Sequence, residues 1–159
     1  MSNDNLVEIA LTAPLAIIME PPIVEGYWVA AKDFFNCVKS FDSLQSQHYR
    51  SYSLLAGFAL ENGLKAFLST RGCSESDLRK YGHDLRTLWS KCHADGLGID
   101  ANMPPHICIL ADGHFMPDFV GAQRHAIRYP IGIHGQQYPN YVEMVSALQN
   151  VFFLVEQQT

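Results

Sequence analysis

The sequence predicts one compact, mostly helical domain of the bundle type. The chain has 159 residues, a length that fits a single domain with a real hydrophobic core. Apolar side chains recur at helical spacing in four long stretches, which is the primary signal of amphipathic helices. Glycines and prolines lie between these stretches and separate the predicted helices.

Residues 1–25 are expected to form an extended arm that precedes the helical domain of residues 26–159. Pro14 and the pair Pro21-Pro22 prevent a long helix in this segment. The apolar residues of the arm are therefore expected to pack along the body of the domain or against a neighbouring subunit.

The first two helices are predicted at about residues 26–47 and 49–70. In the first helix, apolar side chains recur at helical spacing from Trp28 to Phe41. The second helix is apolar on two faces, which is typical of a helix at the centre of a bundle. Gly72 provides its end, because glycine readily adopts the left-handed conformation that follows many helices.

A third helix is predicted after a polar loop at residues 74–77, and it is expected to end near Gly96 or Gly98. Asp84 is expected in its first turn, where a carboxylate suits the helix dipole. The apolar residues that recur at helical spacing in this helix are Leu85, Leu88, Trp89 and Cys92.

The rest of the chain predicts a short or broken helix, a loop and a final helix. Asp112-Gly113 and Pro117 interrupt the helical pattern within residues 99–126. Two prolines and two glycines predict a loop at residues 128–139. The final helix is expected to begin at Asn140, where Asn-Tyr-Val-Glu can form a capping box.

The composition predicts an acidic protein with a partner chain. The net charge is −5, from 11 Lys+Arg and 16 Asp+Glu, whereas a non-specific nucleic-acid binder usually has the reverse balance. Hydrophobic residues make up 48% and charged residues 17%, which indicates either a very large core or a covered apolar face. We favour a homodimer that covers this face, because homo-oligomers are common. Local basic sites are possible only at Arg124 with Arg128, and at Arg79, Lys80 and Arg86.

The sequence is expected to belong to a soluble, cytoplasmic protein. It has no signal-peptide pattern, and no apolar run reaches the roughly 20 residues of a membrane span. The cysteines lie far apart without a C-x-x-C pair, so neither a zinc ribbon nor a disulfide framework is expected. Reduced thiols of this kind are typical of the cytosol. The four cysteines are Cys37, Cys73, Cys92 and Cys108.

Glu61 interrupts an otherwise apolar face of the second predicted helix. A carboxylate buried there is costly unless it is paired or protonated. Two interpretations remain open. Either Glu61 lies at the edge of the apolar stripe and bonds along the helix to Lys65, or it pairs with an arginine or histidine of another helix in an internal polar cluster.

His83 and Asp84 mark the start of the third predicted helix. The helix dipole disfavours an imidazolium at this position, which suits a neutral donor or acceptor role for His83. The structural alternative is a histidine that caps the helix or fixes the preceding loop.

Arg128 and His134 are the candidate catalytic residues. Five residues separate them in the Pro/Gly-rich loop, and Arg124, His125 and Tyr129 lie beside them. Arginine can stabilise the charge that develops on phosphate oxygens, and histidine can move the proton of a ribose hydroxyl. Metal-independent RNA cleavage requires this pairing. The alternative is a basic loop that hydrogen-bonds to helix ends.

No metal and no cofactor is predicted. The sequence contains no P-loop, no dinucleotide fingerprint and no G-x-S-x-G elbow. No histidine shares a convincing helix face with a second ligand at a spacing of four residues. The alternative is a metal site assembled from distant parts of the chain, among His48, His83, His93, His106, His114, His125 and His134.

Three segments together resemble the HEPN superfamily. They are Ala59–Leu68, with the sequence ALENGLKAFL, Tyr81–Leu88, with YGHDLRTL, and Ala126–Pro130, with AIRYP. The order and spacing of Glu61 and the Gly-His-Asp-Leu motif carry most of the resemblance, which covers about residues 26–157.

The resemblance implies an antiparallel four- to five-helix bundle that is commonly dimeric. Members of this superfamily are often ribonucleases with an Arg-x(4–6)-His motif, toxins among them, or partners of minimal nucleotidyltransferases, and others are non-catalytic. Arg128 and His134 match that spacing. Active members typically have a polar residue after the arginine at a helix start, whereas Tyr129-Pro130 follows it here. The sequence therefore favours the structural version of the fold, in which Arg128 meets Glu61 and His83.

We therefore expect a HEPN-like, dimeric binding or accessory module of an RNA- or nucleotide-related system. Its partner would be RNA, a nucleotide, a nucleotidyltransferase or an antitoxin protein. The alternative is a metal-independent endoribonuclease that uses Arg128 and His134 across a dimer cleft, and a third hypothesis is a small-ligand pocket inside the bundle. The predicted polar cluster consists of Glu61, His83, Asp84, Arg124 and Tyr129.

Overall fold

The described part of the chain is a bundle of six helices. A computed structural model describes residues 23–41, 48–114 and 137–159, and these ranges contain no strand. The all-helical class is therefore confirmed, while most of the predicted arm lies outside these residues. None of the described helices is long and apolar enough to cross a membrane. The helices are α1 (Ile23–Lys39), α2 (Tyr49–Thr70), α3 (Glu75–Tyr81), α4 (Leu85–Ala94), α5 (Pro105–His114) and α6 (Tyr141–Glu156).

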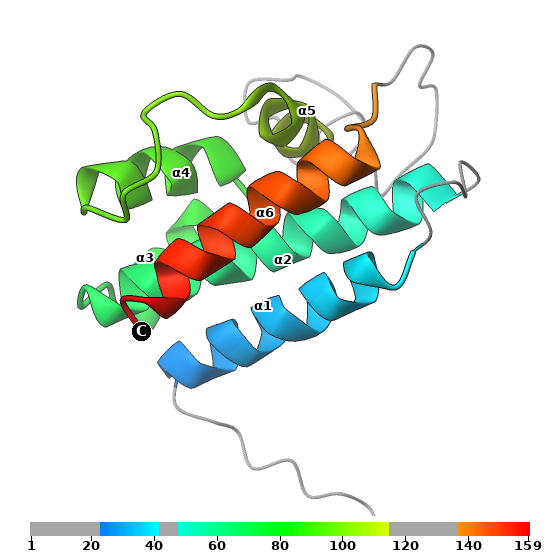
Figure 1. Ribbon diagram of the computed structural model, residues 1–159. Coiled ribbons are helices and arrows are strands. Elements are labelled where there is room, and N and C mark those ends of the chain that lie inside the picture. The colour runs from blue at the N-terminus through cyan, green and yellow to red at the C-terminus, as the bar shows by residue number, and fades with distance from the viewer. Residues whose placement is uncertain (1–22, 42–47, 115–136) are drawn as a thin grey trace, which may run out of the picture.

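α2 occupies the centre of the bundle. It contacts each of the other five helices, and α1 and α6 run along it (Figure 1). Its observed bounds match the predicted helix at residues 49–70. Side chains on several sides of α2 are buried, as expected for a helix that is apolar on two faces.

Aromatic rings join α1 to α6. The ring of Phe152 lies 5.3 Å from that of Trp28 and 4.7 Å from that of Phe35, measured between centroids. At the other end of α6, the hydroxyl of Tyr141 donates to the carbonyl of Val38 at 2.9 Å. The buried residues of α6 are Met144, Leu148, Val151, Phe152 and Val155.

α1 differs from the predicted first helix at both ends. It begins at Ile23, inside the segment predicted as an arm, and it ends at Lys39 rather than near residue 47. At this end the hydroxyl of Ser40 donates to the carbonyl of Cys37 at 2.6 Å. A side chain that hydrogen-bonds to nearby backbone in this way competes with continuation of the helix.

The loop predicted at residues 74–77 is wrong, because α3 begins there. The hydroxyl of Ser74 accepts from the backbone N–H of Asp77 at 3.2 Å and so caps the helix. Leu78 is the residue of α3 that is buried. A helix of seven residues with one buried side chain has no apolar periodicity from which it could be predicted.

α4 and α5 pack against α2 and against each other. α4 buries all four of its predicted apolar residues. α5 starts with Pro105, which suits a first helical position, and runs through Asp112-Gly113 to His114. The interruption predicted at this dipeptide is therefore wrong. Arg86 of α4 donates to Asp112 at 2.7 and 2.9 Å and holds the two helices together.

The four cysteines are free thiols, as their spacing predicts. Cys92 is buried in the core, where its thiol contacts the carbonyl of Leu64 at 3.5 Å. Burial raises the pKa of the Cys92 thiol far above its ordinary value, so this thiol fills space and is not a nucleophile.

Candidate functional site

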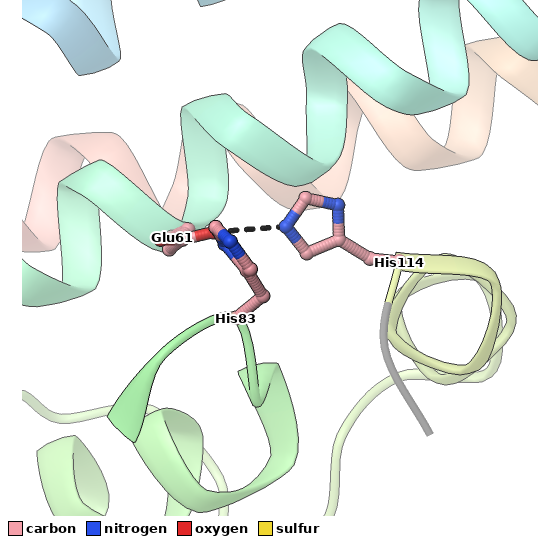
Figure 2. A group of neighbouring side chains, drawn as sticks. All are labelled: Glu61, His83 and His114. Carbon is pink, nitrogen blue, oxygen red and sulfur yellow. Dashed lines mark hydrogen bonds and ion pairs between the residues drawn. The ribbon is translucent and has the colours of Figure 1, made fainter. Parts of the chain in front are cut away.

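Three side chains from separate elements meet at one carboxylate oxygen inside the bundle. Glu61 lies in the middle of α2, His83 in the turn between α3 and α4, and His114 at the end of α5. Nδ1 of His83 lies 2.8 Å from Oε2 of Glu61, and Nε2 of His114 lies 2.9 Å from the same oxygen. Figure 2 shows the two imidazole rings reaching the carboxylate from their different elements.

Lys65 holds the other oxygen of Glu61. Its Nζ donates to Oε1 of Glu61 at 2.8 Å and to the carbonyl of Gly82 at 2.8 Å. Gly82 has a φ of +56°, in the left-handed region that favours glycine, and this turn directs its carbonyl and His83 toward α2. Lys65 therefore ties α2 to the turn that carries His83.

These four residues, Glu61, Lys65, His83 and His114, form what we name the Glu61 cluster. Glu61, Lys65 and His114 are 5%, 6% and 0% exposed, whereas the side chain of His83 is 38% exposed. Among the described residues, Glu61 is the one buried carboxylate. The cluster is therefore closed toward the core and open to solvent on the His83 side.

Glu61 is ionised at neutral pH. Burial raises the pKa of its carboxyl, but hydrogen bonds from His114, Lys65 and His83 outweigh this effect and lower the pKa to about 2. An ionised carboxylate only accepts hydrogen bonds. The ring nitrogens of His83 and His114 that face Glu61 are therefore N–H donors.

Gly57 makes room for the ring of His114. A Cβ atom at position 57 would lie 2.3 Å from Nδ1 and 2.8 Å from Cγ of His114. Gly57 precedes Glu61 by one turn, so both lie on the same face of α2. The ring of Phe58 borders the cluster, at 5.2 Å from the ring of His114 and 6.3 Å from that of His83.

The structure brings together two of the predicted site residues, Glu61 and His83. Asp84 follows His83 but turns away from the cluster, because its carboxylate accepts from the N–H of Thr87 at 3.0 Å and from its hydroxyl at 2.7 Å. Asp84 is thus the N-cap of α4 and not a residue of its first turn. Arg124, Arg128, Tyr129 and His134 lie outside the described residues, so the contact of Arg128 with Glu61 stays a prediction.

The two sequence interpretations of Glu61 each describe part of its surroundings. Glu61 bonds along α2 to Lys65, and it also pairs with histidines from two other elements. The second oxygen of the carboxylate allows both arrangements at once, so they are not alternatives.

His114 and Gly57 cannot be assigned to this site from the sequence. His114 is 53 positions from Glu61 and has no second ligand at helical spacing on α5. A glycine inside the strongest helical pattern of the chain is the one signal that another group packs closely there. That signal does not say which group it is.

The three described residues at which a local basic site is possible are each paired with a carboxylate. The pairs are Arg79 with Glu75, Lys80 with Asp77, and Arg86 with Asp112. Their charges are therefore offset locally by neighbouring carboxylates.

A groove of about 550 Å³ lies beside α6. Its walls include Trp89 of α4, Ile99 of the following loop, and Val142 and Val151 of α6. Val142 is 62% exposed, and Phe153 on the same helix is 61% exposed. These two exposed hydrophobic side chains and the groove are separate from the Glu61 cluster.

Comparison of the chain with protein-family models, with curated proteins and with solved structures gave no match. The chemistry of the two candidate sites is therefore inferred from the residues that form them. The first is an ionised carboxylate held by two imidazoles and an ammonium group. The second is an apolar groove with exposed hydrophobic side chains on its helix.

Proposed function

We propose that the chain is a HEPN-like helical domain that acts as a dimeric, non-catalytic binding or accessory module of an RNA- or nucleotide-related system. The observation that carries the proposal is the outer face of α6. Val142 and Phe153 are exposed there, and the apolar groove lies beside the same helix. Exposed hydrophobic side chains next to an apolar groove are typical of a surface that binds another protein.

A second copy of the chain fits this surface. Val142 and Phe153 are separated by about three turns of α6, or roughly 16 Å, so they lie on one face of the helix. If two α6 helices cross antiparallel about a two-fold axis, Phe153 of each copy meets Val142 and the groove of the other. This contact also accounts for the high proportion of hydrophobic residues, 48%, in a chain of this size.

The Glu61 cluster supports a structural role over a catalytic one. Both oxygens of Glu61 accept hydrogen bonds from groups of the chain itself. A buried, fully paired carboxylate fixes the elements that pair with it, because loss of a partner leaves an uncompensated charge. The cluster thus braces α2 against the His83 turn and α5.

The relation to RNA or nucleotides comes from the resemblance to HEPN proteins. Within such systems, the net charge of −5 favours a protein partner, such as an antitoxin or a minimal nucleotidyltransferase, over free nucleic acid.

The oligomeric state tests the proposal. Sedimentation equilibrium of the wild-type protein should give twice the chain mass of 17.8 kDa, and Phe153→Glu should give the chain mass itself. Val29→Glu is the matched control, because Val29 is also an exposed hydrophobic residue, at 46%, but belongs to α1. It should stay dimeric. A monomeric wild type, or a dimer that Phe153→Glu leaves intact, would refute dimerisation through α6.

A metal-independent ribonuclease is the second candidate function, and the Arg128-x5-His134 spacing favours it. Incubation with single-stranded RNA in EDTA separates the two. The binding module leaves the RNA intact, whereas the ribonuclease cleaves it and loses that activity in His134→Ala but not in His125→Ala. Cleavage that survives both Arg128→Ala and His134→Ala comes from a contaminant.

A further inference from the structure

We propose that the Glu61 cluster binds a divalent transition-metal ion of the Zn²⁺ and Co²⁺ class. Oε2 of Glu61, Nδ1 of His83 and Nε2 of His114 all lie within 4.8 Å of one another. Each atom comes from a different element of the fold, and two of the three side chains are buried. Two imidazoles and one carboxylate are a donor set that such ions prefer.

The three ligand atoms need little movement to hold the ion. Bonds of about 2.0 Å from a tetrahedral ion place neighbouring ligand atoms about 3.3 Å apart. The two nitrogens are now 2.8 and 2.9 Å from the carboxylate oxygen and within 4.8 Å of each other. Each nitrogen must therefore move about half an ångström away from the oxygen, and the two nitrogens must come to about 3.3 Å from each other. We assign the fourth position to a water molecule, because the side chain of His83, one of the three ligands, is 38% exposed.

Metal binding removes the hydrogen from each of the two ring nitrogens that face Glu61. Each ring nitrogen that faces Glu61 now carries a hydrogen, because the ionised carboxylate accepts from both. On metal binding each nitrogen gives up this hydrogen, to the other nitrogen of its ring or to solvent, and donates its lone pair to the ion. The ion then holds together the same three elements that the two N–H groups hold in the metal-free protein.

Two neighbouring residues prepare the site. Lys65 holds Oε1 of Glu61 and so presents Oε2 to the two imidazoles, in the way that outer hydrogen bonds orient metal ligands. Gly57 fixes the place of the His114 ring against α2. The ammonium of Lys65 also repels a cation, which disfavours Mg²⁺ and Ca²⁺ because these ions depend on carboxylate charge. Imidazole nitrogens compensate for this repulsion only with Zn²⁺ or its chemical relatives.

Titration of the metal-free protein with Co²⁺ tests the site directly. We expect one Co²⁺ per chain, with the visible absorption of a tetrahedral ion, and its displacement by Zn²⁺. We also expect Zn²⁺ to raise the thermal midpoint, because the folded chain alone presents the three ligands together. Mg²⁺ at the same concentration should neither displace Co²⁺ nor raise the thermal midpoint.

Substitutions assign the binding to the cluster. His83→Ala, which removes a partly exposed ring, should weaken Co²⁺ binding more than about tenfold, and Glu61→Gln should do the same. His48→Ala is the matched control, because His48 is exposed before α2 and makes no side-chain capping bond. It should bind as the wild type does.

Three results would overturn the proposal. They are no stoichiometric Co²⁺ binding by the wild type, equal binding by wild type and His83→Ala, or an equal loss in His48→Ala. If His83→Ala or Glu61→Gln lowers the thermal midpoint, circular dichroism below that midpoint establishes that the chain is folded during the titration. The test does not depend on dimerisation through α6, because all three ligands lie in one chain.

Discussion

Gly57 has two opposing effects on the stability of the protein. Inside a helix, glycine costs about 1 kcal/mol relative to alanine, so its replacement usually stabilises. At position 57, however, a Cβ atom would lie 2.3 Å from the ring of His114. The missing side chain is therefore what allows His114 to reach Glu61, and the helix tolerates the glycine for that reason.

We predict that Gly57→Ala destabilises the protein, even though alanine is the better helix former. Overpacking against the His114 ring should lower the free energy of unfolding by about 1–3 kcal/mol. Urea denaturation measures this change. Gly63→Ala on the same helix is the control, because a Cβ there would lie 3.4 Å from the ring of Phe152, an ordinary contact. It should be neutral or stabilising by up to about 1 kcal/mol. If Gly57→Ala instead stabilised the protein, the ring of His114 could not lie against position 57.

Helix ends link neighbouring elements of the fold. At α6, the side chain of Asn140 accepts from the N–H of Glu143 at 3.2 Å, which is the first half of the predicted capping box. In a capping box the side chain of Glu143 would accept from the N–H of Asn140. Here Nδ1 of His106 on α5 accepts from this N–H at 3.1 Å, and Nε2 of His106 pairs with Glu143. The cap of α6 therefore includes a residue of α5 and joins the two helices.

At α4, we predict that Asp84 contributes through its cap alone. Asp84→Ala should lower the free energy of unfolding by about 1 kcal/mol, the usual effect of losing an N-cap. Asp84→Asn should cost less, because an amide oxygen still accepts from the N–H of Thr87. Thermal or urea unfolding gives both values. A loss of about 3 kcal/mol or more would instead be typical of a buried ion pair and would assign Asp84 to the Glu61 cluster.

At the scale of the whole molecule, the Glu61 cluster connects α2, the α3–α4 turn and α5. Its contribution to stability depends on pH in a direction that the pKa of Glu61 sets. The folded state lowers this pKa from 4.5 to about 2, so the unfolded chain binds the proton more readily. The stabilisation is therefore complete above about pH 4.5 and is lost as the pH falls toward 2.

We predict that acid weakens the metal-free protein through Glu61, by on the order of 3 kcal/mol over this range. Urea unfolding in EDTA from pH 2 to pH 7 measures the change. Glu61→Gln should be less stable at neutral pH and should lose less stability as the pH falls. Other carboxylates titrate in both proteins, so the difference between the two curves isolates Glu61. Parallel curves would show that Glu61 is not the group responsible.

The sequence by itself determined half of the described helices. α2, α4 and α6 could be predicted because their apolar residues recur over several turns and because residues such as Gly72 and Asn140 mark helix ends. These signals are local, and local propensity and burial agree in those segments. α3 could not be predicted in this way, since seven residues with one buried side chain show no period.

The sequence also determined that Glu61 needs a partner, because a carboxylate on an apolar helix face must be paired or protonated. Only the tertiary structure decided which side chains pair with Glu61. His83 and His114 reach Glu61 through the turn at Gly82 and through the packing of α5 against α2. Such contacts depend on how helices dock over long separations in the chain, and no local spacing encodes that docking.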